Sequence, residues 1–294
     1  MTCAFLPFKR MGWSDVCAAF FKLSRPAWTA GAGLALAAVV GQNMATAGPF
    51  EIAISPSRFE LSAKSSARVG QLLTIHNVGA VPTEVSIRTL DWTYSEEGVL
   101  AYLDELQPDS CRPWVTLERR FVKINAASSA QFRFQLDIPA DAKRGECRLM
   151  LAIEGVEPAQ QAVIQSGGAS LSLPVNGRIA VAVYVAVNGA ESRFSVKDIG
   201  VKTLQGRPTP AITVTNDGDA HGRLDGSLDA QDAAGQALEL VPDGTPVLPG
   251  QTRTLALQPR TEPNQKPRDF KLPVKVKGTL DWERGSFKID AELK

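Results

Sequence analysis

Hydrophobic and polar residues alternate through most of the chain after residue 48, while helical spacing is almost absent. The alternation comes in short runs that Gly, Pro, Asn and Asp interrupt about every ten residues, which is typical of an all-β sandwich. The pattern therefore predicts two β-sandwich domains, residues 48–188 and residues 189–294. The runs are residues 51–62, 69–79, 83–94, 114–124, 129–139, 145–155 and 170–187 in the first domain, and residues 193–201, 210–217, 221–230, 236–242, 252–259, 269–283 and 286–293 in the second.

The most regular alternation lies at the end of the first predicted domain. The odd-numbered residues from Ile179 to Val187 are all β-branched, and only alanines and Tyr184 stand between them. Because neighbouring side chains of a strand point to opposite faces, we expect the β-branched face to be buried. Residues 188–190 (NGA) then predict a short hinge to the second domain.

The first 47 residues are expected to be a cleavable signal peptide. Two basic residues, Lys22 and Arg25, precede an apolar run over residues 30–40, and a small-residue site over residues 45–47 follows. We expect cleavage before Gly48. The apolar run has about a dozen residues, whereas a membrane anchor needs about 20. Both an extended leader that begins at the first residue and a start at the second methionine fit this pattern.

The charge balance indicates a soluble, exported product. The chain has 32 Lys and Arg against 31 Asp and Glu, so no large field of one sign attracts nucleic acid or an anionic membrane. No second long apolar run follows the leader, so we expect no membrane span in the mature chain. The periplasm of a Gram-negative cell is the compartment that fits best.

The cysteines predict one structural disulfide. Cys3 and Cys17 fall in the leader, so only Cys111 and Cys147 remain in the mature chain, and a pair of cysteines in an oxidising compartment is expected to be bonded. A redox-active pair is the alternative. The C-x-x-C spacing that lowers a thiol pKa is absent here, so we favour a structural role.

The sequence lacks the patterns of common catalytic and metal sites. Its two histidines, His76 and His221, lie in different predicted domains, which argues against a His-based triad or a multi-histidine metal site. Residues 216–219 (NDGD) form a turn without the downstream acid of a helix-loop-helix calcium site. No phosphate-binding glycine loop and no G-x-S-x-G motif occurs. We therefore predict a protein that is not an enzyme and uses no metal or cofactor.

Five stretches of the first predicted domain carry a resemblance to a known family: residues 54–61 (ISPSRFEL), 62–66 (SAKSS), 72–79 (LLTIHNVG), 121–136 (FVKINAASSAQFRFQL) and 138–149 (IPADAKRGECRL), with an alternating strand from Arg178. Together they resemble the periplasmic pilus-assembly chaperones of the chaperone-usher pathway. The resemblance covers about residues 50–187, and the second domain matches only in type. It implies two immunoglobulin-like β-sandwich domains behind the signal segment.

The resemblance also implies a binding site for the end of a client chain. In that family, one basic residue on the first strand and one on the last strand of the first domain hold the C-terminal carboxylate of a pilus subunit. Arg58 and Arg178 occupy the matching positions. A guanidinium group can bind a carboxylate through two parallel hydrogen bonds. The alternative is that both arginines are ordinary exposed residues that pair with nearby acids.

The family further implies a donor strand before the second basic residue. Here Ala169, Leu171, Leu173 and Val175 alternate in that place and would enter the groove of an incomplete subunit while the backbone supplies its missing strand. Pro174 removes one backbone donor, which an edge strand tolerates. The alternative is an ordinary edge strand of the sandwich.

The sequence therefore favours a periplasmic chaperone that binds fimbrial or other secreted subunits by donor-strand complementation, with roles in fimbrium biogenesis and cell wall organization. Its partners would be pilus or secreted subunits and an outer-membrane usher. The alternative is a non-catalytic structural or adhesive module of the cell envelope whose loops bind protein or carbohydrate. The sequence names neither the client nor the oligomeric state.

Overall fold

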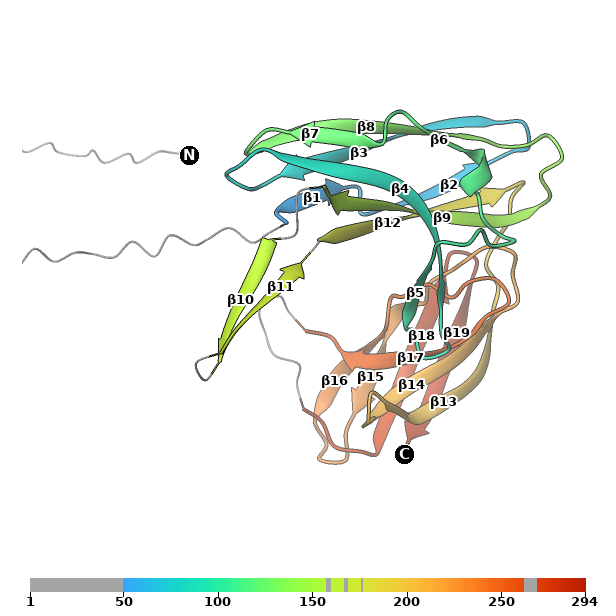
Figure 1. The fold of residues 1–294 in the computed structure, drawn as a ribbon. Helices are drawn as coiled ribbons and strands as arrows, with labels where there is room; N and C mark the ends of the chain where they lie inside the picture. Colours follow the sequence, from blue (N-terminus) through green and yellow to red (C-terminus); the bar gives the residue numbers. More distant parts are fainter. Residues whose placement is uncertain (1–49, 157–159, 167–168, 176, 262–268) are drawn as a thin grey trace, which may run out of the picture. The chain divides into compact units, whose positions relative to one another are not determined.

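The computed structural model describes residues 50–156, 160–166, 169–175, 177–261 and 269–294. The expected signal peptide, residues 1–47, lies outside these residues. Thr46–Lys294 form one compact unit. Every regular element in the described part is a β-strand, apart from the short 3-10 helix η1 (Figure 1). None of the described segments is a helix with the length and apolar character needed to cross a membrane.

The first sandwich has two facing sheets, β1-β3-β8-β6 and β2-β12-β9-β4-β5, with β7 beside β4. In immunoglobulin letters these are the ABED sheet and a GFC sheet with a short first-strand piece at its edge, so the topology is immunoglobulin-like. Its elements are β1 Ile52–Ser55, β2 Arg58–Ala63, β3 Arg68–Asn77, β4 Thr83–Tyr94, β5 Leu100–Leu103, η1 Arg112–Trp114, β6 Val115–Leu117, β7 Phe121–Ile124, β8 Ser128–Asp137, β9 Gly145–Gly155 and β12 Arg178–Val187.

The second sandwich follows the order β13-β14-β17-β16-β15-β18-β19, which is the immunoglobulin order A-B-E-D joined to C-F-G. Its strands are β13 Phe194–Leu204, β14 Arg207–Asn216, β15 Asp225–Gln231, β16 Ala237–Pro242, β17 Thr252–Pro259, β18 Val274–Trp282 and β19 Gly285–Leu293. The all-β fold of two immunoglobulin-like sandwiches that the sequence predicts is confirmed.

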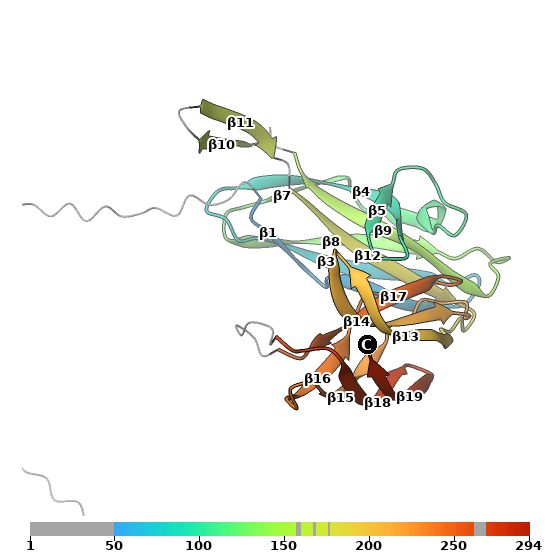
Figure 2. The ribbon, with the colours of Figure 1, turned by 90° about the horizontal axis from the view of Figure 1, so that it is seen from below.

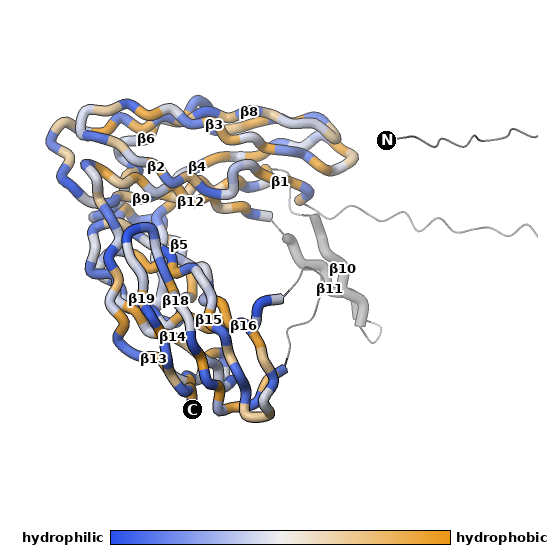
Figure 3. The backbone as a smooth tube through the Cα atoms, turned by 180° about the vertical axis from the view of Figure 1, so that it is seen from behind, coloured by the Kyte–Doolittle hydropathy of each residue, from blue (hydrophilic) through white to orange (hydrophobic). Residues whose placement is uncertain are grey.

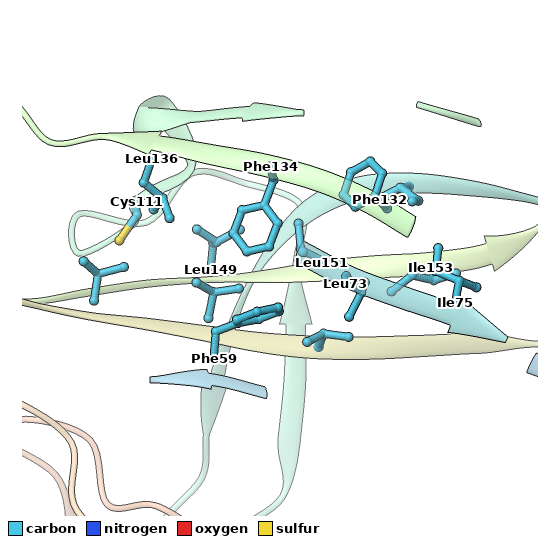
Figure 4. Close-up of a cluster of buried hydrophobic side chains, with 14 of the residues drawn as sticks. Phe59, Leu73, Ile75, Cys111, Phe132, Phe134, Leu136, Leu149, Leu151 and Ile153 are labelled. Atoms are coloured by element: carbon cyan, nitrogen blue, oxygen red, sulfur yellow. The ribbon is translucent and has the colours of Figure 1, made fainter. Parts of the chain in front are cut away.

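The alternating pattern builds the core of the first sandwich, as predicted. Figure 3 shows hydrophobic and hydrophilic segments following each other along its strands. Val181, Val183 and Val185 of β12 are completely buried. Figure 4 shows the facing side chains between the sheets, among them Phe59 and Phe134, whose rings meet edge to face at 5.1 Å. Full burial of such side chains stabilises the fold by about 1.5–3 kcal/mol each.

The first predicted run, residues 51–62, is divided between the two sheets. The bond between Ser55 and Pro56 is cis, and there the chain leaves β1, which pairs with β3, and enters β2, which pairs in parallel with β12. A proline has no N–H for a ladder and therefore suits such an interruption. The pairing of β2 with β12 begins with Arg58 opposite Ala182.

The run over residues 170–187 is likewise divided, into the strands Ala169–Val175 and Arg178–Val187 of different sheets. Two further predictions about strands need correction. The run over residues 114–124 is not one strand, because β6 pairs with β8 whereas β7 pairs with β4 in the other sheet. Strand β5 was not predicted. It forms a hairpin with the end of β4, and residues of this hairpin, such as Tyr94, contact the second sandwich. Contacts of that kind are set by distant parts of the chain and leave little local signal.

The sandwiches meet through an apolar cluster and a buried arginine. Leu248 of the second sandwich packs with Trp92 and Tyr184 of the first. Nearby, the buried Arg253 guanidinium lies 4.9 Å from the ring centre of Tyr94. Tyr184 stands on the face of β12 opposite the valines, so both faces of this strand are covered near its middle.

The predicted disulfide joins Cys111 to Cys147, with their Cα atoms 5.2 Å apart. It ties the segment before η1 to β9, and both cysteines are buried in the core. The backbone N–H of Cys111 also donates to the carbonyl of Arg148 at 3.1 Å. By the chain-entropy model, a bond that closes a loop of this size stabilises the fold by about 3–4 kcal/mol.

Candidate functional site

The predicted donor segment forms a strand of its own. Strand β11 (Ala169–Val175) pairs antiparallel with β10 (Gln160–Ser166), and within the described residues this ribbon pairs with no other strand. The four predicted donors, Ala169, Leu171, Leu173 and Val175, take every second register position, opposite Ser166, Ile164, Ala162 and Gln160. Their side chains lie outside what the structure describes, so their role stays a prediction.

The start of β12 also has an edge that no described strand covers. Strand β9 pairs with β12 on one side from Arg178 onward. On the other side, β2 begins only opposite Ala182, and no other described strand pairs with residues 178–181. The main chain over these four residues therefore presents hydrogen-bonding groups to an incoming strand, and β2 closes the edge beyond them.

Arg58 lies where this open edge ends. Its Nε donates to Oε1 of Glu60 at 2.8 Å, and Nη1 of Arg223 donates to the same oxygen at 2.6 Å. The side chain of Arg58 is about half exposed. The nearby imidazole of His221 and these two guanidinium groups outweigh the partial burial of Glu60 and lower the pKa of its carboxyl to about 2. The carboxylate of Glu60, which belongs to this chain and not to a client, therefore lies between two arginines.

Arg178 binds a different internal carboxylate. Its Nε donates to Oε1 of Glu154 at 2.5 Å, and its guanidinium lies 5.7 Å from the ring centre of Tyr102. Glu154 also accepts from Nε and Nη2 of Arg88, at 3.3 and 3.2 Å. Arg88 in turn donates to Asp104 at 2.6 Å. Arg178 thus begins a ladder of charges that crosses the sheet from β12 to the end of β5.

The structure does not bring Arg58 and Arg178 together. Arg58 is opposite Ala182, four positions beyond Arg178 on β12, which corresponds to about 13 Å along a strand. The two arginines also line different cavities, one of about 590 Å³ and one of about 460 Å³. The switch of the first strand between sheets explains the separation, because it fixes where β2 begins. The expectation that both groups meet at one carboxylate is not met in this structure, and their roles as anchors stay predictions.

Sequence reasoning missed the residues that surround Arg58. Arg223 and His221 belong to the second sandwich, and 163 positions separate Arg223 from Glu60. No role was predicted for His221, but its side chain is only 10% exposed and stacks on the ring of Tyr184 at 3.8 Å. No local pattern could have indicated this, since the contact depends on how the sandwiches meet.

The turn over residues 216–219 is held by protein groups. Asp219 accepts from Nε of Arg144 at 2.6 Å and from the backbone N–H of Glu191 at 2.7 Å. Asn216 is buried and donates to the carbonyls of Ala220 and Val247. Among the described residues, no group of three or more His, Cys, Asp or Glu side chains is arranged to hold a metal ion.

No family model matches this chain, and no curated protein matches it. Among solved structures, the YadV chaperone is similar at 13% identity with a TM-score of 0.44, over 83% of this chain and 100% of that one. A chain of the Salmonella enterica SafA pilin–SafB chaperone complex gives 13% identity and a TM-score of 0.44, over 83% and 98%. A chain of the Acinetobacter baumannii CsuC–CsuE chaperone-tip adhesion subunit complex gives 12% and 0.42, over 82% and 97%.

Proposed function

We propose that this chain is a periplasmic chaperone that lends strand β11 to secreted or fimbrial subunits that lack one strand. The proposal is best supported by two observations on the described strands: β11 pairs only with β10, and residues 178–181 of β12 have no partner on the side where β2 follows. Proteins usually cover or blunt such edges, because they pair readily with other chains. Strand edges without a partner are therefore suitable surfaces for strand addition.

The position of β2 gives the added strand a direction. A client strand that continues the line of β2 along β12 lies beside residues 178–181 and reaches Arg58. If it runs parallel to β12, as β2 does, its last residue is the one nearest Arg58. A chain-terminal carboxylate there can accept two charge-assisted hydrogen bonds from the guanidinium group. Arg58 is thus the better-placed anchor, and Arg178 is a second basic contact at the start of β12.

An incoming carboxylate has to compete with Glu60 for Arg58. The side chains of Arg58 and Glu60 are 53% and 39% exposed, and exposed ion pairs stabilise a fold by only about 0–1 kcal/mol. The ion pair between Glu60 and Arg58 can therefore be broken at a small cost in free energy. The main driving force is burial of apolar client surface by the donor residues, about 25 cal/mol for each Å².

Capture of a client from the periplasm tests this function. The chain is purified with its bound proteins as the wild type, as an Arg58→Ala, Arg178→Ala double variant, and as an Arg68→Ala control. Arg68 is an exposed arginine in an ion pair with Asp137, at a distance from the open edge. We expect a subunit to co-purify with the wild type and the control and to be lost from the double variant. Equal recovery from all three, or no subunit at all, supports an adhesive or structural module instead.

A further inference from the structure

His221 joins the second sandwich to three strands of the first. Its Nδ1 lies 2.5 Å from Oε2 of Glu146 on β9, and its backbone N–H donates to the same oxygen at 2.9 Å. Its ring stacks on Tyr184 of β12. The side chain of Glu146 is only 1% exposed. A buried carboxylate between two donors of one residue is a strong attachment point, since removing either partner leaves the other without compensation.

The second ring nitrogen of His221 has two competing neighbours. Nη1 of Arg223 lies 3.1 Å from Nε2, and Oε1 of Glu60 lies 3.7 Å from it. In a neutral ring with its proton on Nδ1, Nε2 accepts from Arg223. In a protonated ring, Nε2 carries a hydrogen and can no longer accept, and a guanidinium group offers no acceptor. Glu60 is then the neighbour that can receive the hydrogen bond.

We infer that His221 is a proton-operated clasp between the two sandwiches: uptake of one proton shifts Nε2 from Arg223 to Glu60 and strengthens the hold of the loop before β15 on the first sandwich. The clasp consists of His221, Glu146, Glu60, Arg223 and Tyr184. It belongs to the free chain and does not depend on strand donation.

The charges around His221 favour its protonated form. Glu146 on β9 and Glu60 on β2 face the ring directly, while Arg223 on its own loop and Arg58 on β2 oppose them. Tyr184 on β12 is uncharged at neutral pH, since burial raises the pKa of its hydroxyl further. The rest of the same cavity has more acids than bases, namely Glu191, Asp225, Asp281 and Glu283 against Arg284.

The sign of the pH effect follows from these contacts. Burial lowers the pKa of the His221 imidazole, but the hydrogen bonds to Glu146 and Glu60 outweigh burial, so the pKa lies above its usual value of 6.5. A group with a raised pKa in the folded state adds stability that is full below pH 6.5 and is lost as pH rises through the raised value. The clasp is therefore tight in mildly acidic solution and loosens toward alkaline pH.

The other polar contacts between the sandwiches do not share this dependence. Arg144 and Asp219 form an ion pair at 2.6 Å, and each partner favours the charged form of the other, so neither titrates near neutral pH. Arg253 of the second sandwich lies 4.9 Å from the ring centre of Tyr94 of the first, and arginines keep their proton in this range. Among the contacts described between the sandwiches, His221 is thus the group suited to respond between pH 5 and 8.

A histidine NMR titration of the purified chain tests the electrostatics of the clasp. We expect the ring signals of His221 to titrate above pH 6.5, and the Glu146→Gln variant to bring the midpoint down, because the neutral amide no longer favours the charged ring. The Nε–Hε signal of Arg223 should shift with the same midpoint, because the guanidinium group loses His221 as an acceptor and keeps only Glu60. A midpoint at or below 6.5, or one that Glu146→Gln leaves in place, overturns the inference.

Denaturant unfolding at pH 5.5 and pH 8.5 tests the effect on the fold. His221→Phe keeps a ring over Tyr184 but cannot titrate, and His76→Asn removes the other histidine, which is partly exposed and bonded to Ser129. In the wild type and in His76→Asn, we expect the folding equilibrium constant to be larger at pH 5.5 than at pH 8.5. The increase should be up to tenfold for each unit by which the pKa of His221 is raised. His221→Phe should lose that part of the response. If His221→Phe does not fold, Glu146→Gln replaces it, and an unchanged response in the variant used contradicts the clasp.

Discussion

Arg58 stands directly opposite Ala182, at the point where β2 begins to cover the edge of β12. This pairing places the candidate anchor at the closed end of an otherwise open edge. Arg178 lies at the other end of the uncovered stretch and is bound to Glu154. The two arginines therefore should not contribute equally to the binding of a chain end, which single substitutions can resolve.

Arg58→Ala should reduce client capture more than Arg178→Ala does. The reason is that a strand in line with β2 ends beside Arg58, while Arg178 contacts an earlier part of it. Loss of a charge-assisted hydrogen bond to a carboxylate costs about 1.5–3 kcal/mol, or roughly 10- to 150-fold in affinity. Quantitative co-purification of the periplasmic client measures this. Equal losses from the two single variants contradict the assigned direction.

Leu173→Asp should abolish client capture, whereas Ser172→Asp should leave most of it. Alternate positions of β11 face opposite sides, so only the leucine belongs to the predicted donor face. A carboxylate buried in an apolar groove without a partner is strongly unfavourable. The same pulldown checks the pair, with circular dichroism to show that both variants fold. Equal capture by both variants argues against donation by this strand.

Glu60→Gln should remove an acid-sensitive part of the stability. The pKa of Glu60 is lowered from 4.5 to about 2, so its contribution is present above pH 4.5 and is lost as pH falls toward 2. Urea unfolding of the wild type and the variant at pH 5 and at pH 2.5 measures the difference. Stability should fall less between these values in Glu60→Gln, and an equal fall means that the carboxylate is not held as described.

Gly98→Ala should destabilise the contact of the β4–β5 hairpin with the second sandwich. Gly98 has a φ of +87°, and a Cβ atom there would lie 2.5 Å from Nη2 of the buried Arg253. Gly235→Ala is a matched control, because its φ of +80° is similar but a Cβ atom meets nothing within 4 Å. We expect backbone strain to lower the free energy of unfolding by about 1 kcal/mol in both variants. The contact with Arg253 should lower it by about 1–3 kcal/mol more in Gly98→Ala. Similar losses in thermal unfolding mean that the space beside Arg253 is less restricted.

Reduction of the disulfide should cost about 2–5 kcal/mol of unfolding free energy. The double variant Cys111→Ala, Cys147→Ala reproduces the reduced state without a reagent and should lose a similar amount. Denaturant unfolding with and without dithiothreitol measures both. A wild type that dithiothreitol leaves fully stable, although the bond is shown to be reduced, contradicts the structural role.

The local pattern of the sequence predicts most strands but not their partners. The run over residues 83–94 coincides with β4, and the donor segment with β11, because alternation is a property of neighbouring residues. The runs over residues 51–62 and 114–124 look equally continuous, yet each divides between two sheets. Whether a strand stays in one sheet depends on backbone pairing with distant segments, which alternation does not record.

The site shows the same limit. Arg58 and Arg178 could be chosen from their places on the first and last strands, but their separation follows from the register between β2 and β12. His221 and Arg223 could not be chosen at all, since they reach Glu60 and Glu146 from the second sandwich. The charged contacts and the burial at this site arise where the two domains meet. The local pattern of one domain does not indicate which of its residues contact the other domain.

The abrupt start of β2 has a consequence for the choice of client. Because β2 covers the edge of β12 from Ala182 onward, the position of a client strand on β12 would be set by the last residue of that strand. The start of β2 would therefore fix the number of residues between the C-terminus of the client and the groove that the donor side chains fill. Clients with unrelated sequences could then bind the same chaperone, provided that the same number of residues separates the groove from the C-terminus in each client.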